Sequence, residues 1–138
     1  MAIPESKSIT DANKTTIKRL VEEFWNKGNT DLAESLVTND YERIELFSEE
    51  VGRGPEGLKS AAAEWRGAFP DLNLDLNQLL AEDDLVACQW TFTGTHEGEL
   101  KGTPPTGRSV KVSGLSIIKF ADGKITTETV STDLLSLM

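Results

Sequence analysis

Residues 94–108, GTHEGELKGTPPTGR, contain the only histidine of the chain, His96, together with four of its eleven glycines and two of its five prolines. Imidazole changes its charge closest to neutral pH among side chains, which makes a histidine a candidate for proton transfer. A histidine in such a turn-rich stretch is more often a hydrogen-bonding structural residue. Both interpretations of His96 stay open, and we expect this stretch to border a site.

Cys88 is the only cysteine, so it has no partner for an internal disulfide. It lies in the apolar run LVACQWTF, where a small buried hydrophobic side chain is expected rather than a nucleophile. One histidine and one cysteine cannot form a zinc site, and the carboxylates lack the spacing of a calcium loop. The glycines of residues 94–108 do not form a phosphate-binding P-loop motif. Any chemistry is therefore expected to need no metal.

The chain has 138 residues, of which 23 are acidic and 14 are basic, giving a formal net charge of −9. Nucleic acids and anionic lipid surfaces both require a basic face, so neither is an expected partner. No apolar segment approaches the roughly 18 residues of a membrane span. The N-terminal sequence MAIPESKSIT lacks the apolar region of a secretory signal. We expect a cytoplasmic protein.

The first 70 residues predict three helices and one strand. Apolar residues at helical spacing predict an amphipathic helix over residues 10–27, which ends at Gly28. A short second helix is predicted over residues 30–37, and YERIELF, residues 41–47, is predicted to be a strand. GRGPEGLKSAAAEWRGAFPD predicts a third helix with Pro55 in its first turn and an end before Pro70.

The remaining chain follows the period of two that is typical of strands. Leu72, Leu74 and Leu76 alternate with polar residues, and strands are predicted over residues 85–93, 109–120 and 124–132. Helices followed by a run of strands indicate an α+β fold, here a curved antiparallel sheet wrapped around N-terminal helices. We predict one domain over residues 1–138, with residues 1–9 as a flexible N-terminal segment. The open end of such a sheet can become a pocket.

Four motifs, GPEGL, AFPDL, GTHEGELKGTPPTGR and DGKI, occur in this order along the chain. From about residue 14 to the C-terminus, the sequence resembles the SnoaL-like polyketide cyclases, or ester cyclases, of the nuclear-transport-factor-2-like superfamily. The resemblance implies a cone-shaped α+β fold and an intramolecular aldol ring closure without metal or cofactor, in which an acidic side chain moves the substrate proton. It also implies a hydrophobic, carbonyl-bearing substrate and a homodimer that forms through the outer face of the sheet.

The resemblance assigns residue roles mainly on the last strand. The final Asp of the family pattern GKI-V-E-H-W-D-x-x-D falls on Asp133, which would be the general acid/base; the alternative is that Asp133 caps a C-terminal turn. Glu128, Thr129 and Val130 replace the His, Trp and first Asp of the pattern, and Glu128 can face either the cavity or solvent. Gln89 stands where relatives often have Arg, which makes it a candidate polar contact.

Other side chains are expected to shape the pocket. Trp25, Trp65 and Trp90 each lie on an apolar stripe or in a buried strand, and are interpreted as cavity walls or core. Tyr41 and Glu45 occupy the region that supplies acid/base groups in ketosteroid-isomerase-like relatives, an analogy at the level of the fold.

Three functions are compatible with these residues. The first is a cofactor-free cyclase or isomerase with Asp133, and secondarily His96, as acid/base groups. The second is a non-catalytic protein that binds an apolar ligand, which the replaced residues of the last strand favour. The third is a hydratase or epoxide hydrolase, which ranks last because it needs an Asp–Arg–Asp arrangement around a water. The arginines of the central part of the chain lie in contexts typical of exposed residues: Arg43, Arg53, Arg66 and Arg108.

Overall fold

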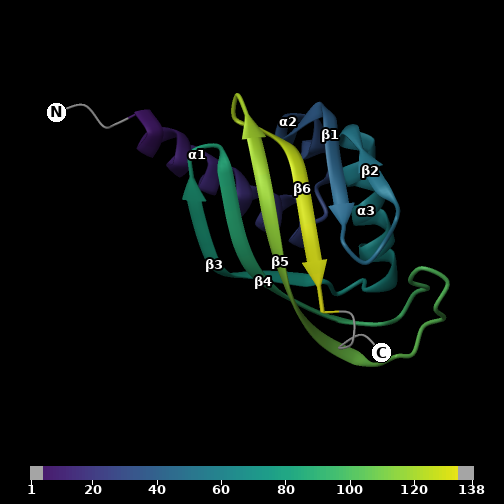
Figure 1. Cartoon of the computed structure of the whole chain (residues 1–138). Coiled ribbons are helices and arrows are strands. Elements are labelled where there is room, and N and C mark those ends of the chain that lie inside the picture. The colour runs from purple at the N-terminus through teal and green to yellow at the C-terminus, as the bar shows by residue number, and fades with distance from the viewer. Residues whose placement is uncertain (1–4, 134–138) are drawn as a thin grey trace.

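The computed structural model describes residues 5–133 of the chain (Figure 1). α1 (Glu5–Arg19) continues directly into the wider turns of η1 (Leu20–Asn26), so the two form one long helical rod. Its apolar stripe, with Ile17 and Phe24 fully buried, confirms the predicted amphipathic helix, and the positive φ of Gly28, 74°, ends it. The helix begins at Glu5, earlier than predicted, so residues 5–9 of the segment expected to be flexible belong to it. Residues 1–4 lie outside the described part.

Short elements connect this rod to the sheet. η2 (Thr30–Leu32) and α2 (Ala33–Leu36) occupy the position of the predicted second helix. β1 (Val37–Glu45) starts earlier than the predicted strand, and the sequence did not predict β2 (Val51–Arg53), which pairs antiparallel with β1. α3 (Gly54–Ala68) begins and ends beside the two prolines that predicted it.

Six strands form one sheet in the order β2-β1-β6-β5-β4-β3. β3 (Asn73–Glu82), β4 (Leu85–Thr95), β5 (Ser109–Ala121) and β6 (Lys124–Thr132) form the predicted antiparallel meander. β1 pairs with β6 in parallel, so the sheet is mixed rather than wholly antiparallel. This parallel pair joins segments that are far apart in the chain, so no hairpin turn in the sequence predicts it.

The curved sheet packs its inner face against the helices, and Figure 1 shows α1 and α3 on the same side of it. β5 illustrates the alternation: Val112 and Ile118 are buried, whereas Leu115 and Ile117 point outward and are exposed. The core therefore lies between the inner face of the sheet and the apolar stripes of the helices. No helix in residues 5–133 is long and apolar enough to cross a membrane.

Residues 96–108 connect β4 to β5, and we call them the β4–β5 loop. The loop is closed by its own hydrogen bonds, since the His96 N–H donates to the Arg108 carbonyl at 2.9 Å. It also contacts the end of α3, where the Gly98 N–H donates to the Ala68 carbonyl at 3.0 Å. A Cβ atom on Gly98 would lie 2.1 Å from the Gly67 carbonyl oxygen, so only glycine allows this close approach. The loop is thus held against α3.

Candidate active site

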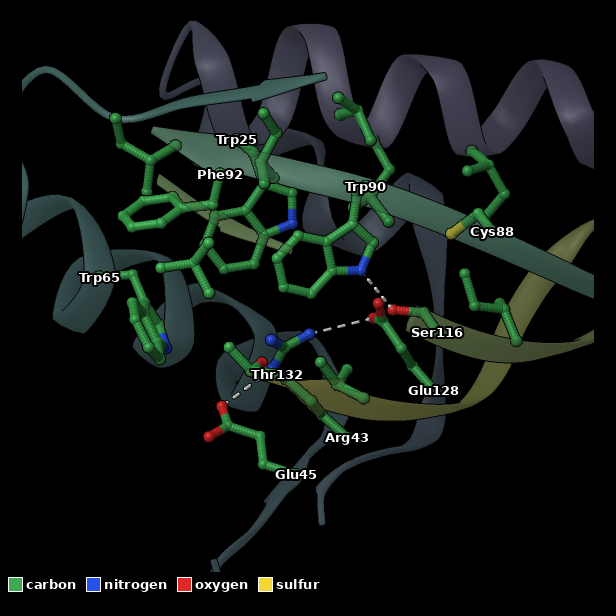
Figure 2. Close-up of a pocket in the computed structure, with 18 residues that line it drawn as sticks. Trp25, Arg43, Glu45, Trp65, Cys88, Trp90, Phe92, Ser116, Glu128 and Thr132 are labelled. Carbon is green, nitrogen blue, oxygen red and sulfur yellow. Dashed lines mark hydrogen bonds and ion pairs between the residues drawn. The ribbon is translucent and has the colours of Figure 1, made fainter. Parts of the chain in front are cut away.

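An apolar cavity lies between the inner face of the sheet and the helices α1, η1 and α3 (Figure 2). Four aromatic side chains form much of its wall together with aliphatic residues. They are Trp25, Trp65, Trp90 and Phe92. Its polar groups gather at one end. They are Arg43, Glu45, Ser116, Glu128 and Thr132.

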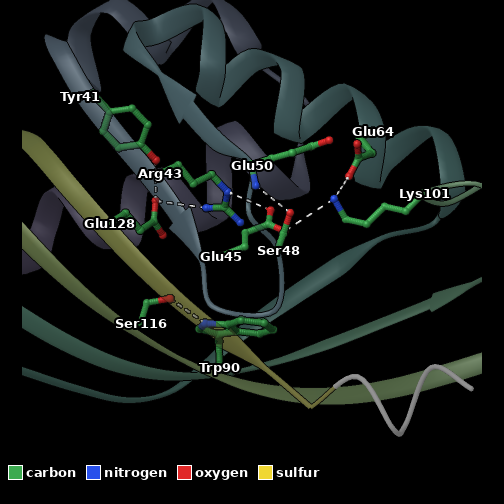
Figure 3. Close-up of polar contacts among 10 residues, drawn as sticks. All are labelled: Tyr41, Arg43, Glu45, Ser48, Glu50, Glu64, Trp90, Lys101, Ser116 and Glu128. Carbon is green, nitrogen blue, oxygen red and sulfur yellow. Dashed lines mark hydrogen bonds and ion pairs between the residues drawn. The ribbon is translucent and has the colours of Figure 1, made fainter.

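β1 and β6 together build the polar end. Tyr41, Arg43 and Glu45 alternate along β1, so all three side chains point inward, and each is at least nine-tenths buried. Glu128 of β6 is the direct register partner of Arg43. The Arg43 Nη1 atom lies 3.3 Å from Glu128 Oε1, and the Arg43 Nε atom lies 3.5 Å from Glu45 Oε1. One guanidinium therefore stands between two buried carboxylates (Figure 3).

Burial and charge fix the protonation of the groups around Arg43. Burial alone would lower the pKa of Arg43, but the charges of Glu128 and Glu45 and the neighbouring Tyr41 outweigh burial and raise it. Burial, followed by the negative charge of Glu128, raises the pKa of Tyr41 well above its usual range. Tyr41 therefore stays neutral, and its hydroxyl donates a hydrogen bond of 2.9 Å to Glu128 Oε1.

Two polar atoms at this end of the cavity have no hydrogen-bond partner within the described residues. They are the Nε atom of Arg43, a donor, and the Oε2 atom of Glu45, an acceptor, and both are buried. Each atom keeps only an ion-pair contact, Arg43 Nε with Glu45 Oε1 at 3.5 Å and Glu45 Oε2 with Lys101 Nζ at 3.7 Å. A buried polar atom without a hydrogen bond costs up to about 1–3 kcal/mol. A ligand that offers an acceptor beside a donor, or a labile proton, would satisfy both atoms.

The aromatic wall is held by specific contacts. The indole Nε1–H of Trp90 donates to Ser116 Oγ at 3.0 Å. The guanidinium carbon of Arg43 lies 5.4 Å from the centre of the Trp25 ring, within cation–π range. Trp65 stacks on Phe69, with ring centres 6.2 Å apart. These contacts hold the aromatic side chains in place in the cavity wall.

Cys88 belongs to the cavity wall, as a buried thiol. Burial, together with the charge of Glu128, raises the pKa of Cys88 to about 12, so the side chain is a thiol at neutral pH. This agrees with the prediction of a buried apolar residue. In residues 5–133, no group of three or more His, Cys, Asp or Glu side chains is placed to hold a metal ion.

The structure brings together four of the seven predicted site residues: Trp25, Trp65, Trp90 and Glu128 all line the cavity. Gln89 does not, because its neighbours in β4 point inward and its own side chain is exposed on the outer face. Asp133 is exposed just after β6, where its backbone N–H donates to the Ser113 carbonyl at 3.1 Å.

His96 is also placed away from the cavity lining. Its ring stacks on Phe69, with ring centres 5.3 Å apart, and its Nδ1 atom lies 3.2 Å from Thr106 Oγ1. His96 is thus buried between Phe69 and Thr106, with the residue 6% exposed. These contacts are typical of a structural histidine, which is one of the two interpretations of His96.

Sequence reasoning misplaced Arg43, which is 8% exposed and lines the cavity, although its context indicated an exposed residue. Leu46, just after β1, is 65% exposed, whereas the inward face of the strand carries the polar side chains of Tyr41, Arg43 and Glu45. The signal that was available is the spacing Tyr-x-Arg-x-Glu, which puts these three groups on one face of a strand.

Comparison with known proteins places this geometry in a family. The model of the SnoaL-like polyketide cyclases matches residues 15–138. The aklanonic acid methyl ester cyclase DauD of Streptomyces sp. (strain C5) is 29% identical over 112 residues, which are 79% of this chain and 68% of the relative. The corresponding cyclase DnrD of Streptomyces peucetius is also 29% identical, over 79% of this chain and 76% of its own.

Solved structures agree with the sequence comparison. A protein from Jannaschia sp. CCS1 that is described as a SnoaL-like polyketide cyclase superposes with a TM-score of 0.88 at 28% identity, covering 100% of this chain and 94% of that one. TsrD from Streptomyces laurentii superposes with a TM-score of 0.82 at 26% identity, covering 92% of each chain. The chain belongs to the SnoaL-like polyketide cyclase family.

Proposed function

We propose that this protein is a cofactor-independent cyclase or isomerase that acts on a small hydrophobic molecule with a carbonyl group. The observation that carries the proposal is that two buried atoms at the polar end of an apolar cavity, Arg43 Nε and Glu45 Oε2, make no hydrogen bond within the described residues. An N–H donor beside a carboxylate oxygen that accepts no hydrogen bond matches a carbonyl oxygen beside an acidic C–H bond. This assignment moves the acid/base role from Asp133 to Glu45.

The reaction follows from that match. Glu45 removes a proton from the carbon next to the carbonyl, while the guanidinium of Arg43 donates to the oxygen on which the enolate charge develops. The enolate carbon then attacks a second carbonyl of the same molecule, which closes a ring by a new C–C bond. The resulting alkoxide takes the proton back from Glu45, so the product is an isomer of the substrate.

Tyr41 and Glu128 support this step without moving a substrate proton. The Oε1 atom of Glu128 accepts a hydrogen bond from the Tyr41 hydroxyl and forms the ion pair with Arg43, so this atom is already occupied. The pair holds the guanidinium in place, which leaves Nε for the substrate. Because the arrangement exists before substrate binds, little reorganisation is needed when the charge develops.

The cavity favours a small substrate. Its free volume is about 70 Å³, whereas sites for drug-sized ligands have roughly 300–1,000 Å³. A polycyclic ligand would require Trp90 or its neighbours to move, while a compact ring or short chain would need little change. The relatives are named for aklanonic acid methyl ester, which supports carbonyl chemistry on this scaffold; we propose a smaller dicarbonyl compound for this protein.

The test uses two substrates of different size. Purified protein is incubated with heptane-2,6-dione or with aklanonic acid methyl ester, and products are separated by liquid chromatography with mass detection. Ring closure gives an isomer of unchanged mass, 3-hydroxy-3-methylcyclohexanone for the first substrate, or its dehydrated enone. We expect a rate above the protein-free reaction, and a greater acceleration for the small dione. Unchanged substrate, with a raised Tm of the protein, would support the non-catalytic binding function instead.

One observation favours a second candidate function. The guanidinium of Arg43 stands between the carboxylates of Glu45 and Glu128, the kind of acid–Arg–acid arrangement whose expected absence ranked the hydratase last. A water held at the Glu45 Oε2 atom could be activated for addition to an epoxide. A product heavier than the substrate by one water, labelled by H2¹⁸O, would identify this reaction, whereas ring closure introduces no label.

We also propose that two copies pair through the outer face of the sheet. Leu80 of β3, Ala87 of β4 and Ile117 of β5 are successive register partners and form an apolar row across three strands, with Leu80 67% and Ile117 52% exposed. Ile117→Lys should convert a dimer to a monomer in sedimentation velocity. Leu46→Lys, at an exposed apolar residue after β1, is the control and should leave the dimer intact.

A further inference from the structure

The β4–β5 loop contacts Glu45, a residue of the polar end of the cavity, through Lys101 rather than His96. Leu100 and Thr103 exchange two backbone hydrogen bonds, of 3.0 and 2.8 Å, around Lys101 and Gly102. Both central residues have positive φ, 48° and 85°, which is the geometry of a tight two-residue hairpin turn. A lysine rarely adopts this conformation. The turn therefore fixes the direction from which the Lys101 side chain leaves the loop.

The side chain of Lys101 joins three separate elements. Its Nζ atom lies 2.7 Å from Glu64 Oε1 on α3 and 3.7 Å from Glu45 Oε2 on β1. Figure 3 shows Glu45 between Arg43 and Lys101. Partial burial would lower the pKa of Lys101, but the hydrogen bond with Glu64 and the charges of Glu45 and Glu64 raise it, so the ammonium stays charged.

Glu45 depends on these two cations for its orientation. Its Oε1 atom faces Arg43 at 3.5 Å and its Oε2 atom faces Lys101 at 3.7 Å, with no hydrogen bond to Oε2. Three carboxylates, Glu45, Glu64 and Glu128, gather around these two positive charges. Without Lys101, Glu64 would lose this ion pair, and the position of Glu45 would be set from the Arg43 side only.

We propose that Lys101 is a positioning residue, which holds the Glu45 carboxylate through the ion pair at Oε2 and couples the β4–β5 loop to the site. The inference rests on the proposed function in naming Glu45 as the group that takes the substrate proton. The placement of Lys101 itself comes from the turn, the anchor at Glu64 and the ion pair with Glu45. Lys101 acts through Glu45 and need not touch the substrate.

The test compares Lys101→Met and Lys101→Arg with a matched control, Lys59→Met. Lys59 also bridges two glutamates, Glu34 and Glu56, and its side chain is 28% exposed against 31% for Lys101. Deuterium exchange of heptane-2,6-dione in D2O is followed at several substrate concentrations. In Lys101→Met, kcat should fall about tenfold with KM unchanged. Lys101→Arg should restore kcat, and Lys59→Met should alter neither kcat nor KM.

A second measurement needs no substrate. The side-chain carboxyl carbon of Glu45 is observed by NMR at pH 7, with its signal assigned by its loss in Glu45→Gln. In Lys101→Met this signal should shift, because the carboxylate loses the cation that faces its Oε2 atom, and in Lys59→Met it should not change. Identical Glu45 signals in Lys101→Met and wild type would overturn the inference, whether or not the protein processes the dione. Absence of exchange in the wild type, with the shifted Glu45 signal present in Lys101→Met, would overturn the proposed function alone.

Discussion

The Arg43 Nη1 atom lies 3.3 Å from the Glu128 Oε1 atom, and these residues are direct register partners on the parallel strands β1 and β6. The only parallel pair among the described strands thus carries the central ion pair of the cavity. Because both groups are buried, the pair is weakly screened by solvent. The cost of removing these charges from water is offset only while each charge keeps its partner. Arg43 is therefore the residue on which the arrangement of the polar end depends.

Replacing Arg43 with Met should lower the free energy of unfolding by about 3–5 kcal/mol, because Glu45 and Glu128 lose the guanidinium they share. Urea denaturation at pH 7 measures this change. The control is Arg53→Met, which removes a pair between Arg53 and Glu42 that lies at the surface. An exposed pair contributes less than about 1 kcal/mol. An equal decrease in the free energy of unfolding in both variants would show that the buried ion pair contributes no more than the exposed one.

Gly114→Ala should displace Trp90. A Cβ atom on Gly114 would lie 2.1 Å from Trp90 Cζ2, so the indole must swing away and lose its bond to Ser116. We expect a loss of about 1–3 kcal/mol in stability and a change in tryptophan fluorescence. Gly67→Ala is the control, because its Cβ would meet nothing within 4 Å in α3; it should gain roughly 0.5–1 kcal/mol. An unchanged emission spectrum in Gly114→Ala would contradict the contact.

Tyr41 should make the protein less stable at alkaline pH. Burial and the charge of Glu128 raise the pKa of Tyr41 in the folded state, so above about pH 10 the unfolded chain releases this proton while the folded chain retains it. The contribution of Tyr41 to the free energy of unfolding is therefore full below about pH 10. Above this pH it falls by about 1.4 kcal/mol per pH unit. Tyr41 is the only tyrosine, so tyrosinate absorbance reports on it alone.

The measurement is an absorbance titration in buffer and in urea. Tyrosinate should appear at higher pH in the folded protein than in the denatured one, together with alkaline unfolding. Tyr41→Phe should remove this part of the alkaline loss of stability. Coinciding titrations in buffer and urea would mean that Tyr41 is accessible to solvent in the native state.

The sequence was sufficient for the elements whose signals are local. Ile17 and Phe24 mark the helical stripe, the ADG turn marks the hairpin of β5 and β6, and both are found in the structure. Trp25, Trp65 and Trp90 were correctly interpreted as cavity or core residues, because large aromatic side chains on apolar stripes are buried in most folds.

The polar end of the cavity could not be predicted in the same way. Arg43 and Glu128 meet only because β1 joins β6 in parallel, a pairing for which the chain has no local signal. The burial of Arg43 also runs against its residue type, since an arginine is rarely buried without a partner. Two carboxylates from different elements compensate it here, and that compensation depends on the tertiary structure.

The most direct test of the account compares Glu45→Gln with Asp133→Asn in the exchange of heptane-2,6-dione protons for deuterium in D2O. Exchange isolates the proton-transfer step, which the account assigns to Glu45. Glu45→Gln should slow catalysed exchange by at least about 10², while Asp133→Asn, at an exposed position after β6, should exchange at the wild-type rate. Wild-type exchange in Glu45→Gln, with its loss in Asp133→Asn, would contradict the assignment of the base to the Arg43–Glu45 end of the cavity.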